Sequence, residues 1–346
     1  MKEQLDKWLT LAYHLQASDV HITIGKPPVF RVNGNLIEQD LPKITPKDTT
    51  EIVKSILPED KWLQLKSERE LDFSYGIHGV SRFRVNTYYQ RGELSLAIRI
   101  VPTRIPSIEE LHLPAISKKL MEETQGLILV TGPTGSGKST TLASMIDYMN
   151  HTMKKHIITL EDPIEYMHSH DKSVIDQREV GFDTNSFAAG LRASLRQDPD
   201  VILVGEMRDL ETISTAITAA ETGHLVLGTV HTIGAVSTIE RIIDVFPVEQ
   251  QSQIRIQLSN ILKAVISQRL LITKDRTTRR VATEVLVNTS AVKNLIRNEK
   301  LHQVQNVLQT SKEYGMHTLE MDIKRLLQED LITQEAAAPF IREGSY

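Results

Sequence analysis

A glycine-rich segment that ends in a single lysine is the part of this chain whose residues point most directly to chemistry. The apolar residues 127–130 lead through Thr131 into GPTGSGKST at 132–140, and a helical pattern follows. An apolar strand, a G-x4-G-K-[ST] loop and a helix start together define a phosphate-binding P-loop. Glycine allows backbone conformations that a side chain would block, so the loop N–H groups can turn toward phosphate oxygens. The segment therefore predicts binding of a nucleoside triphosphate rather than an ordinary glycine turn.

The last residues of this loop have the most specific expected roles. Lys138 can reach the β- and γ-phosphates, and the hydroxyl of Ser139 can bind Mg²⁺. The helix that begins here adds the positive end of its dipole. The residues expected to surround the nucleotide phosphates are Gly132, Pro133, Thr134, Gly135, Ser136, Gly137, Lys138, Ser139 and Thr140.

Two segments place carboxylates directly after apolar strands. The sequence EDPIE at 161–165 follows the apolar residues 157–160, and Glu206 and Asp209 follow the apolar residues 201–204. Ligands of open α/β sheets bind beyond the carboxyl ends of the strands. A P-loop enzyme needs acids there to hold Mg²⁺ or its waters and to orient or deprotonate the attacking water. We expect Glu206 to be functional and Asp209 to cap the following helix.

Two histidines bracket a third apolar stretch. His224 precedes and His231 follows the strand expected at 225–230. Their offset of seven is odd, so on a strand they would face opposite sides and form a poor metal pair. His231 stands at the carboxyl end, where a γ-phosphate is expected, which makes it the better candidate to sense that phosphate. Taken alone, either histidine is more simply a structural residue.

Strands and helices alternate from residue 115 onward, and this order predicts the element types that position these groups. A buried strand alternating with a helix favours a largely parallel sheet with helices on both faces. Apolar spacing at positions 254, 258, 261, 262 and 265 predicts a long helix, and the chain from about 249 to 346 is expected to be mostly helical. The expected strands are 127–130, 157–160, 201–204 and 225–230, and the expected helices include 186–197 and 209–222.

A smaller α+β domain is predicted for residues 1–101. Apolar spacing from Leu5 to Leu15 indicates a first helix, and Asn33-Gly34 indicates a tight hairpin. Prolines then predict a linker over 102–114, with the α/β domain covering 115–346. Further elements are expected as strands near 20–24, 29–32, 36–37, 73–75, 81–86 and 94–101, and as a helix over 48–66.

Composition excludes several classes of protein. The chain has 346 residues, 40 basic and 44 acidic side chains, a net charge of −4 and no cysteine. This balance argues against a general nucleic-acid binder, and the missing cysteines exclude disulfides and cysteine-type zinc sites. No apolar run approaches the ~20 residues of a membrane helix, and the N-terminus does not read as a signal peptide. We expect a soluble cytoplasmic protein that reaches a membrane only through partners.

These segments together resemble the type IV pilus retraction ATPases of the secretion ATPase superfamily. GPTGSGKSTT at 132–141 is similar to the Walker A loop of that family, and EDPIE at 161–165 to its Asp box. DPDVILVGEMRD at 198–209 is similar to its Walker B segment, and AAETGHLVLGTVHT at 219–232 to its His box. Shorter similarities are ASDVHI at 17–22, SRFRVN at 81–86, RIIDVFP at 241–247 and ISQRLL at 266–271.

The resemblance implies a fold, an assembly and an activity. It implies a PAS-like N-terminal domain joined to a RecA-like ATPase domain, with six copies in a ring and ATP with Mg²⁺ between the two domains of a protomer. The implied activity is ATP hydrolysis that powers pilus retraction, the depolymerisation of pilin that underlies twitching motility. The implied partner is the inner-membrane pilus platform protein, met at the cytoplasmic face of that membrane, and no nucleic acid.

The resemblance also implies roles for individual residues. Glu206 would arrange Mg²⁺ and its waters and Glu165 would be the general base, although the sequence is also compatible with the reverse assignment. His231 would contact the γ-phosphate, with His224 in support. Arginines of the N-terminal domain should reach the phosphates and neutralise charge in the transition state. The candidates are Arg82, Arg84 and Arg99, with Arg192, Arg196 and Arg208 as second-rank candidates.

One segment departs from the family pattern, and other functions compete with retraction. Residues 291–298, AVKNLIRN, are similar to the family motif AIRNLIRE but differ at Val292, Lys293 and Asn298. An extension or secretion motor is the nearest alternative, and the short N-terminus and missing cysteines count against it. A nucleic-acid motor is disfavoured by the acidic balance. A regulatory module without turnover is disfavoured because Glu165 and Glu206 are both present.

Overall fold

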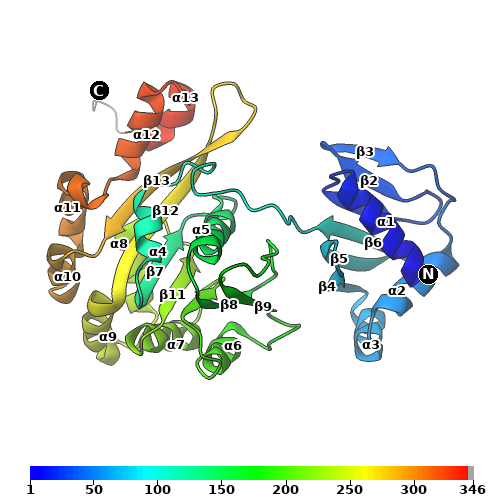
Figure 1. Cartoon of the computed structure of the whole chain (residues 1–346), viewed down its shortest axis with the longest axis horizontal. Helices are drawn as coiled ribbons and strands as arrows, with labels where there is room; N and C mark the ends of the chain where they lie inside the picture. The colour runs from blue at the N-terminus through cyan, green and yellow to red at the C-terminus, as the bar shows by residue number, and fades with distance from the viewer. Residues whose placement is uncertain (342–346) are drawn as a thin grey trace. The chain divides into compact units, whose positions relative to one another are not determined.

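The computed structural model describes residues 1–341, and these residues form two compact units. The first unit comprises Met1–Arg104 together with Glu165–Met167. The second comprises Ile105–Ile164 and the chain from His168 onward. The main crossing at Arg104 lies within the segment 102–114 that the prolines mark, whereas no sequence pattern indicated the return at 165–167. Figure 1 shows the elements of each unit, which are described separately below.

Residues 1–104 build an antiparallel sheet in the order β3-β2-β1-β6-β5-β4, as the predicted α+β domain requires. Helices α1, α2 and α3 contribute Leu9, Ile52 and Leu65 to one core with the sheet residues Phe83 and Ile98. The elements are α1 Lys2–His14, β1 Asp19–Ile22, β2 Val29–Val32, β3 Asn35–Glu38, α2 Pro46–Ile56, α3 Glu59–Glu68, β4 Glu70–Ile77, β5 Ser81–Gln90 and β6 Glu93–Ile100.

Of two local predictions in this unit, the hairpin is confirmed and the single long helix is wrong. Asn33 and Gly34 both have positive φ, 48° and 81°, and join β2 to β3 in the predicted hairpin. The single helix expected over 48–66 is wrong, because the chain breaks between α2 and α3. Leu57 precedes Pro58 and adopts an extended ψ of 136°. A residue before proline is disfavoured in the helical region, so the proline ends one helix and begins the next.

Among residues 105–341, the second unit forms a seven-stranded sheet in the order β13-β12-β7-β11-β10-β8-β9. All neighbours from β12 to β9 are parallel, and only β13 pairs antiparallel. The parallel order brings the carboxyl ends of β7, β10 and β11 to one edge. The strands are β7 Gly126–Thr131, β8 His156–Glu161, β9 Val174–Glu179, β10 Val201–Val204, β11 Leu225–Val230, β12 Leu262–Ile272 and β13 Arg279–Val287.

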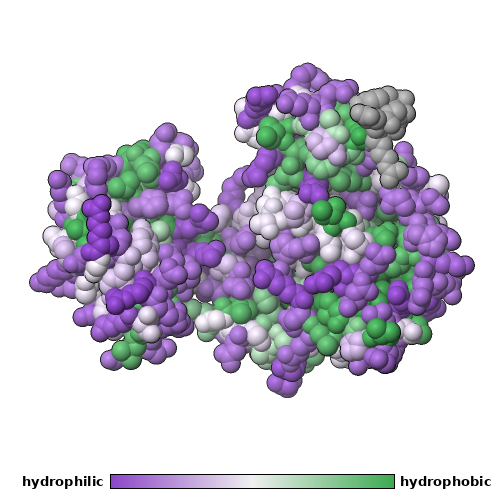
Figure 2. All heavy atoms as spheres, turned by 180° about the vertical axis from the view of Figure 1, so that it is seen from behind, coloured by the Kyte–Doolittle hydropathy of each residue, from purple (hydrophilic) through white to green (hydrophobic). Residues whose placement is uncertain are grey.

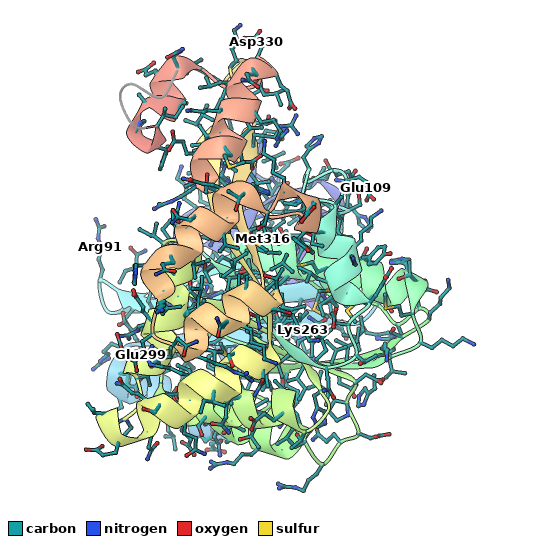
Figure 3. The ribbon with its side chains drawn as sticks, turned by 90° about the vertical axis from the view of Figure 1, so that its left-hand side faces the viewer. Arg91, Glu109, Lys263, Glu299, Met316 and Asp330 are labelled. Atoms are coloured by element: carbon teal, nitrogen blue, oxygen red, sulfur yellow. The ribbon has the colours of Figure 1, made fainter. Side chains whose placement is uncertain are left out.

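Helices cover both faces of this sheet, which confirms the predicted α/β architecture. Leu127 and Leu129 of β7 belong to one core with α7, α8 and α9, while Ile128 and Val130 belong to another with α4 and α5. Figure 3 follows the C-terminal helices from Glu299, after α10, past Met316 to Asp330, after α12. The helices are α4 Ile116–Met121, α5 Lys138–Thr152, α6 Phe187–Ser194, α7 Leu210–Glu221, α8 Ala235–Asp244, α9 Val248–Ile261, α10 Ser290–Arg297, α11 Val304–Thr310, α12 Leu319–Gln328 and α13 Gln334–Ala337.

The prediction that the chain from about 249 is mostly helical is wrong over 262–287. Helix α9 ends at Ile261 and β12 begins at Leu262, with no loop between them. The apolar positions 254, 258, 261, 262 and 265 therefore combine the end of a helix with the start of a strand. Their spacing matches one helical period because the change from helix to strand falls inside the pattern. The edge strand β9 was missed as well.

None of the helices within residues 1–341 combines the length and the apolar character needed to cross a bilayer. The face of the molecule in Figure 2 mixes hydrophilic residues with smaller hydrophobic groups.

His168, where the chain re-enters the second unit, predicts that the stability of this unit depends on pH. Its Nδ1 is enclosed and accepts or donates no hydrogen bond among residues 1–341, and burial lowers the pKa of the ring to about 4. An unfolded histidine titrates near 6.5, so between these values the unfolded state binds the extra proton. The contribution of His168 to the free energy of unfolding is therefore fully present above pH 6.5. It is lost as the pH falls toward 4, which lowers the free energy of unfolding by about 3 kcal/mol.

Urea unfolding of the parent chain and of His168→Gln at several pH values between 7 and 4 would measure this contribution. The difference in unfolding free energy between the two proteins should shrink as the pH falls, because the glutamine does not titrate. His302→Gln, at an exposed position, is the matched control and should keep the parent's pH dependence. Equal pH slopes for the parent and His168→Gln would contradict the prediction.

Candidate active site

The P-loop connects β7 to α5 through three glycines with positive φ. The φ values of Gly132, Gly135 and Gly137 are 144°, 77° and 87°. A Cβ atom on Gly132 would lie 2.5 Å from the carbonyl oxygen of Gln268 and 2.6 Å from the Ser136 hydroxyl oxygen. Residue 132 must therefore be glycine for two reasons, its backbone conformation and the lack of space. The loop has the shape that the sequence predicted.

The first turn of α5 has N–H groups available to bind an anion. Gly137 is the N-cap residue, and no side chain among the described residues caps this end of the helix. The N–H groups of the first helical turn can therefore bind phosphate oxygens. The Ser136 hydroxyl oxygen is enclosed and has no hydrogen-bond partner within residues 1–341. An enclosed polar group of this kind fits a site completed by a ligand.

Lys138 is held inside the loop. Lys138 is only 8% exposed, and its Nζ donates hydrogen bonds to the carbonyl oxygens of Gly132 (2.9 Å) and Pro133 (3.1 Å). These two carbonyl groups keep the ammonium group within the turn where phosphate would bind. Ser139, Thr134 and Gly135 are exposed around it, and Thr140 is half-buried. The predicted phosphate ligands thus lie together in one loop.

Glu206 and His231 meet at the carboxyl edge of the sheet. Glu206 follows β10, its side chain is 19% exposed, and its Oε1 lies 3.2 Å from Nε2 of His231. The Nε of Arg208 donates a hydrogen bond to the same carboxylate oxygen, and this bond raises the pKa of Arg208. The segment Glu206–Arg208 after β10 is bound to β11, because Met207 N donates a hydrogen bond to the Thr229 carbonyl oxygen at 3.0 Å. The structure therefore brings together two residues whose pairing the sequence did not specify.

The carboxylates after β8 have different surroundings. Glu161 accepts hydrogen bonds from Thr159 (2.6 Å) and Gln177 (3.1 Å), which give it a structural role. Glu165 is exposed and groups with the first unit rather than with Glu206. Its role as general base stays a prediction. Asp209 accepts a hydrogen bond from Thr212 N at 2.8 Å and caps α7, so that prediction is confirmed.

His224 does not join this cluster within the chain. It precedes β11, where its carbonyl oxygen accepts from Gly126 N at 3.0 Å and its Nδ1 lies 3.0 Å from the Ala219 carbonyl oxygen. Gly126 begins β7, whereas the P-loop follows the end of β7. A six-residue strand spans about 20 Å, so His224 lies at the opposite edge of the sheet from its own P-loop. The supporting role of His224 in nucleotide binding stays a prediction.

The arginine candidates of the N-terminal unit lie on neighbouring strands. Arg82 and Arg84 are on β5 and Arg99 is on β6, where Arg84 and Arg99 are directly paired across the strands. Arg99 donates a hydrogen bond from Nε to Asp19 at 3.1 Å. Which of the three reaches phosphate stays a prediction. Of the second-rank candidates, Arg208 contacts Glu206 and Arg192 pairs with Glu211.

Gln268 is a site residue that sequence reasoning missed. It lies on β12, and its side-chain amide contacts both the P-loop and α5. The available signal was the segment ISQRLL at 266–271, which the family resemblance had picked out. The sequence pattern predicts a helix over these residues, and a helix there would not lie beside β7 as β12 does.

The residues present fit a nucleotide with Mg²⁺. Within residues 1–341 no group of three or more His, Asp or Glu side chains is arranged to hold a metal ion. Mg²⁺ does not need such a cage, because it keeps several waters and is usually bound by one or two protein oxygens together with substrate phosphates. The Ser139 hydroxyl and the Glu206 carboxylate can supply those oxygens, and the loop and Lys138 can supply the phosphate contacts.

Comparison with known proteins finds relatives over nearly the whole length. The sequence matches the family described as "Type II/IV secretion system protein" over residues 1–337. It is 46% identical over 321 residues to the Pseudomonas aeruginosa "Type IV pilus retractation ATPase PilT", covering 93% of each chain. It is 47% identical over 329 residues to the Neisseria gonorrhoeae "Twitching motility protein", covering 93% of this chain and 88% of that protein. The solved structure described as "Crystal Structure of the Pilus Retraction Motor PilT and Bound ADP" is similar with a TM-score of 0.87 and 50% identity, covering 96% of this chain and 95% of that one.

Proposed function

Because this chain belongs to the type II/IV secretion system protein family and is a P-loop ATPase, we propose that it is the motor that powers type IV pilus retraction. The observation that carries the proposal is the similarity to the Pseudomonas aeruginosa retraction ATPase, which extends over nearly the whole of both chains. The similarity to a twitching motility protein supports the same function. The P-loop and the Glu206–His231 pair supply the chemistry that such a motor needs.

We propose the following division of work for ATP hydrolysis. The P-loop N–H groups and Lys138 bind the β- and γ-phosphates, and Ser139 and Glu206 hold Mg²⁺ directly or through water. Mg²⁺ held there would neutralise part of the phosphate charge. His231, beside Glu206, senses the γ-phosphate. Glu165 takes the proton of the attacking water, and an arginine from the N-terminal unit stabilises the transition-state charge.

The assembly and its place in the cell belong to the same proposal. We propose a homohexamer that acts on the inner-membrane pilus platform protein from the cytoplasmic face. It would be attached to the membrane through that partner, without binding nucleic acid. The net charge of −4 supports the last point, since a nucleic-acid motor needs a basic face.

The test is to count surface pili in a strain whose only copy of the gene encodes Lys138→Ala. A motor that cannot hydrolyse ATP should leave pili extended, so the cells should carry more pili than the parent and lose twitching motility. Lys119→Ala, at an exposed position on α4, is the matched control and should behave like the parent. Immunoblots confirm equal protein levels. A bald cell, or one with unchanged pili, would contradict the role in retraction but not the assignment of the protein as an ATPase.

A further inference from the structure

Strand β12 contacts the P-loop from outside the β7–α5 unit through one buried side chain. Gln268 is 1% exposed. Its Nε2 donates a hydrogen bond to the Ser136 carbonyl oxygen at 2.6 Å, and its Oε1 accepts one from the Thr141 hydroxyl at 3.0 Å. One amide thus joins the middle of the loop to the first turn of α5.

Gln268 suits this position because a primary amide both donates and accepts. Without it, the Ser136 carbonyl group and the Thr141 hydroxyl would be buried without these partners, which is costly. The space around Gln268 is also tight. A Cβ atom on Gly137 would lie 3.2 Å from Nε2 of Gln268. The glycines of the loop and the amide of β12 therefore fit one another closely.

Ser267, the neighbour of Gln268 on β12, binds the segment between β11 and α8 that carries His231. Ser267 Oγ accepts a hydrogen bond from Gly234 N at 3.0 Å, three residues after His231. Glu284, paired with Ser267 across β12 and β13, accepts from Ala235 N at 2.8 Å at the start of α8. The segment that carries His231 is thus anchored at its far end to the strand that also holds the P-loop.

We propose that Gln268 is a positioning residue for nucleotide binding, and that Ser267 beside it positions the His231 segment for hydrolysis. Adjacent residues of a strand point to opposite faces, so the two act on different loops from one backbone. Gln268 keeps the loop carbonyl and N–H groups in the phosphate-binding arrangement. Ser267 keeps His231 in register with the P-loop along β12.

This assignment predicts that the two substitutions change different constants, the Kd for ADP in one variant and kcat in the other. Gln268→Met keeps the volume of the side chain but removes both hydrogen bonds, so the Kd for ADP should rise about tenfold. Ser267→Ala should leave that Kd near the parent value and lower kcat. A general loosening of β12 would move both constants in both variants, so the separation distinguishes positioning from a merely structural role. Gln250→Met, at an exposed position on α9, is the matched control and should leave both constants unchanged.

The experiment uses the full chain, with ADP as the binding probe in calorimetry and phosphate release as the measure of kcat. A parent-like Kd for ADP in folded Gln268→Met would overturn the role of Gln268. Parallel changes of Kd and kcat in both variants would overturn the separate roles. If Gln268→Met does not fold, Thr141→Val removes only one of the two hydrogen bonds and should raise the Kd for ADP by about threefold. An unchanged Kd in folded Thr141→Val would also overturn the proposal.

Discussion

Lys138→Ala should lower ATP hydrolysis at least about a hundredfold while the chain stays folded, since losing one transition-state donor has an effect of that size. Lys138 is the only cation inside the P-loop sequence 132–140. In the structure its ammonium group is bound by the carbonyl oxygens of Gly132 and Pro133, within the turn that would surround the phosphates. Alanine cannot replace that charge, and the negative charge that develops on the phosphates would lose its nearest partner.

The fold should survive this change because the loop rests on a rigid strand and helix. β7 is buried and paired on both sides, and Gln268 holds the loop independently of Lys138. Phosphate release measures the activity, and thermal unfolding without nucleotide measures the fold. Lys119→Ala serves as the control in both assays. Retained hydrolysis in a folded Lys138→Ala protein would show that the P-loop is not the site of turnover.

Glu206→Gln should bind nucleotide normally but lower turnover by at least about a hundredfold, the effect of losing one group that supports the charge of the transition state. Glutamine has the same shape and can still accept the hydrogen bond from Arg208. It lacks the charge needed to hold Mg²⁺ waters or to take a proton. The P-loop is held by β7, α5 and Gln268, so the phosphate contacts do not depend on Glu206.

Measuring ADP binding and phosphate release distinguishes a loss of nucleotide binding from a loss of turnover. The dependence of turnover on Mg²⁺ concentration then tests whether Glu206 arranges Mg²⁺. If Glu206 arranges Mg²⁺, added Mg²⁺ should restore part of the activity of Glu206→Gln. Glu165→Gln should stay inactive at every Mg²⁺ concentration if Glu165 is the general base. Glu240→Gln, at an exposed position on α8, is the matched control. Loss of ADP binding in Glu206→Gln would instead make this carboxylate part of the binding site.

The elements that the sequence predicted well are those with a continuous or regular apolar pattern. The apolar runs at 127–130, 157–160, 201–204 and 225–230 all became buried parallel strands, because only helices on both faces can cover such runs. Strand β12 escaped because its first residues continue the spacing of α9. β12 also includes the buried polar residues Ser267 and Gln268, which interrupt its apolar pattern.

The site was predicted to the extent that its residues are adjacent in sequence. The P-loop is one segment, so its members could be assigned together. The contact between Glu206 and His231 depends on the parallel pairing of β10 with β11, which places the ends of both strands side by side. The contact between Gln268 and Ser136 spans 132 residues and needs the position of β12 in the sheet. Neither pairing can be deduced from spacing along the chain.

The position of β12 has a consequence for the protein during its synthesis. β7 leaves the ribosome long before its neighbour β12, whose residues Leu262–Ser267 pair with Leu127–Thr131. A nascent chain that ends before Leu262 contains the whole P-loop sequence but has one edge of β7 unpaired and no Gln268 to hold the loop. Unpaired strand edges are sites of aggregation and of chaperone binding. Nucleotide affinity should therefore arise late in translation, so that ATP stabilises completed chains and not unfinished ones.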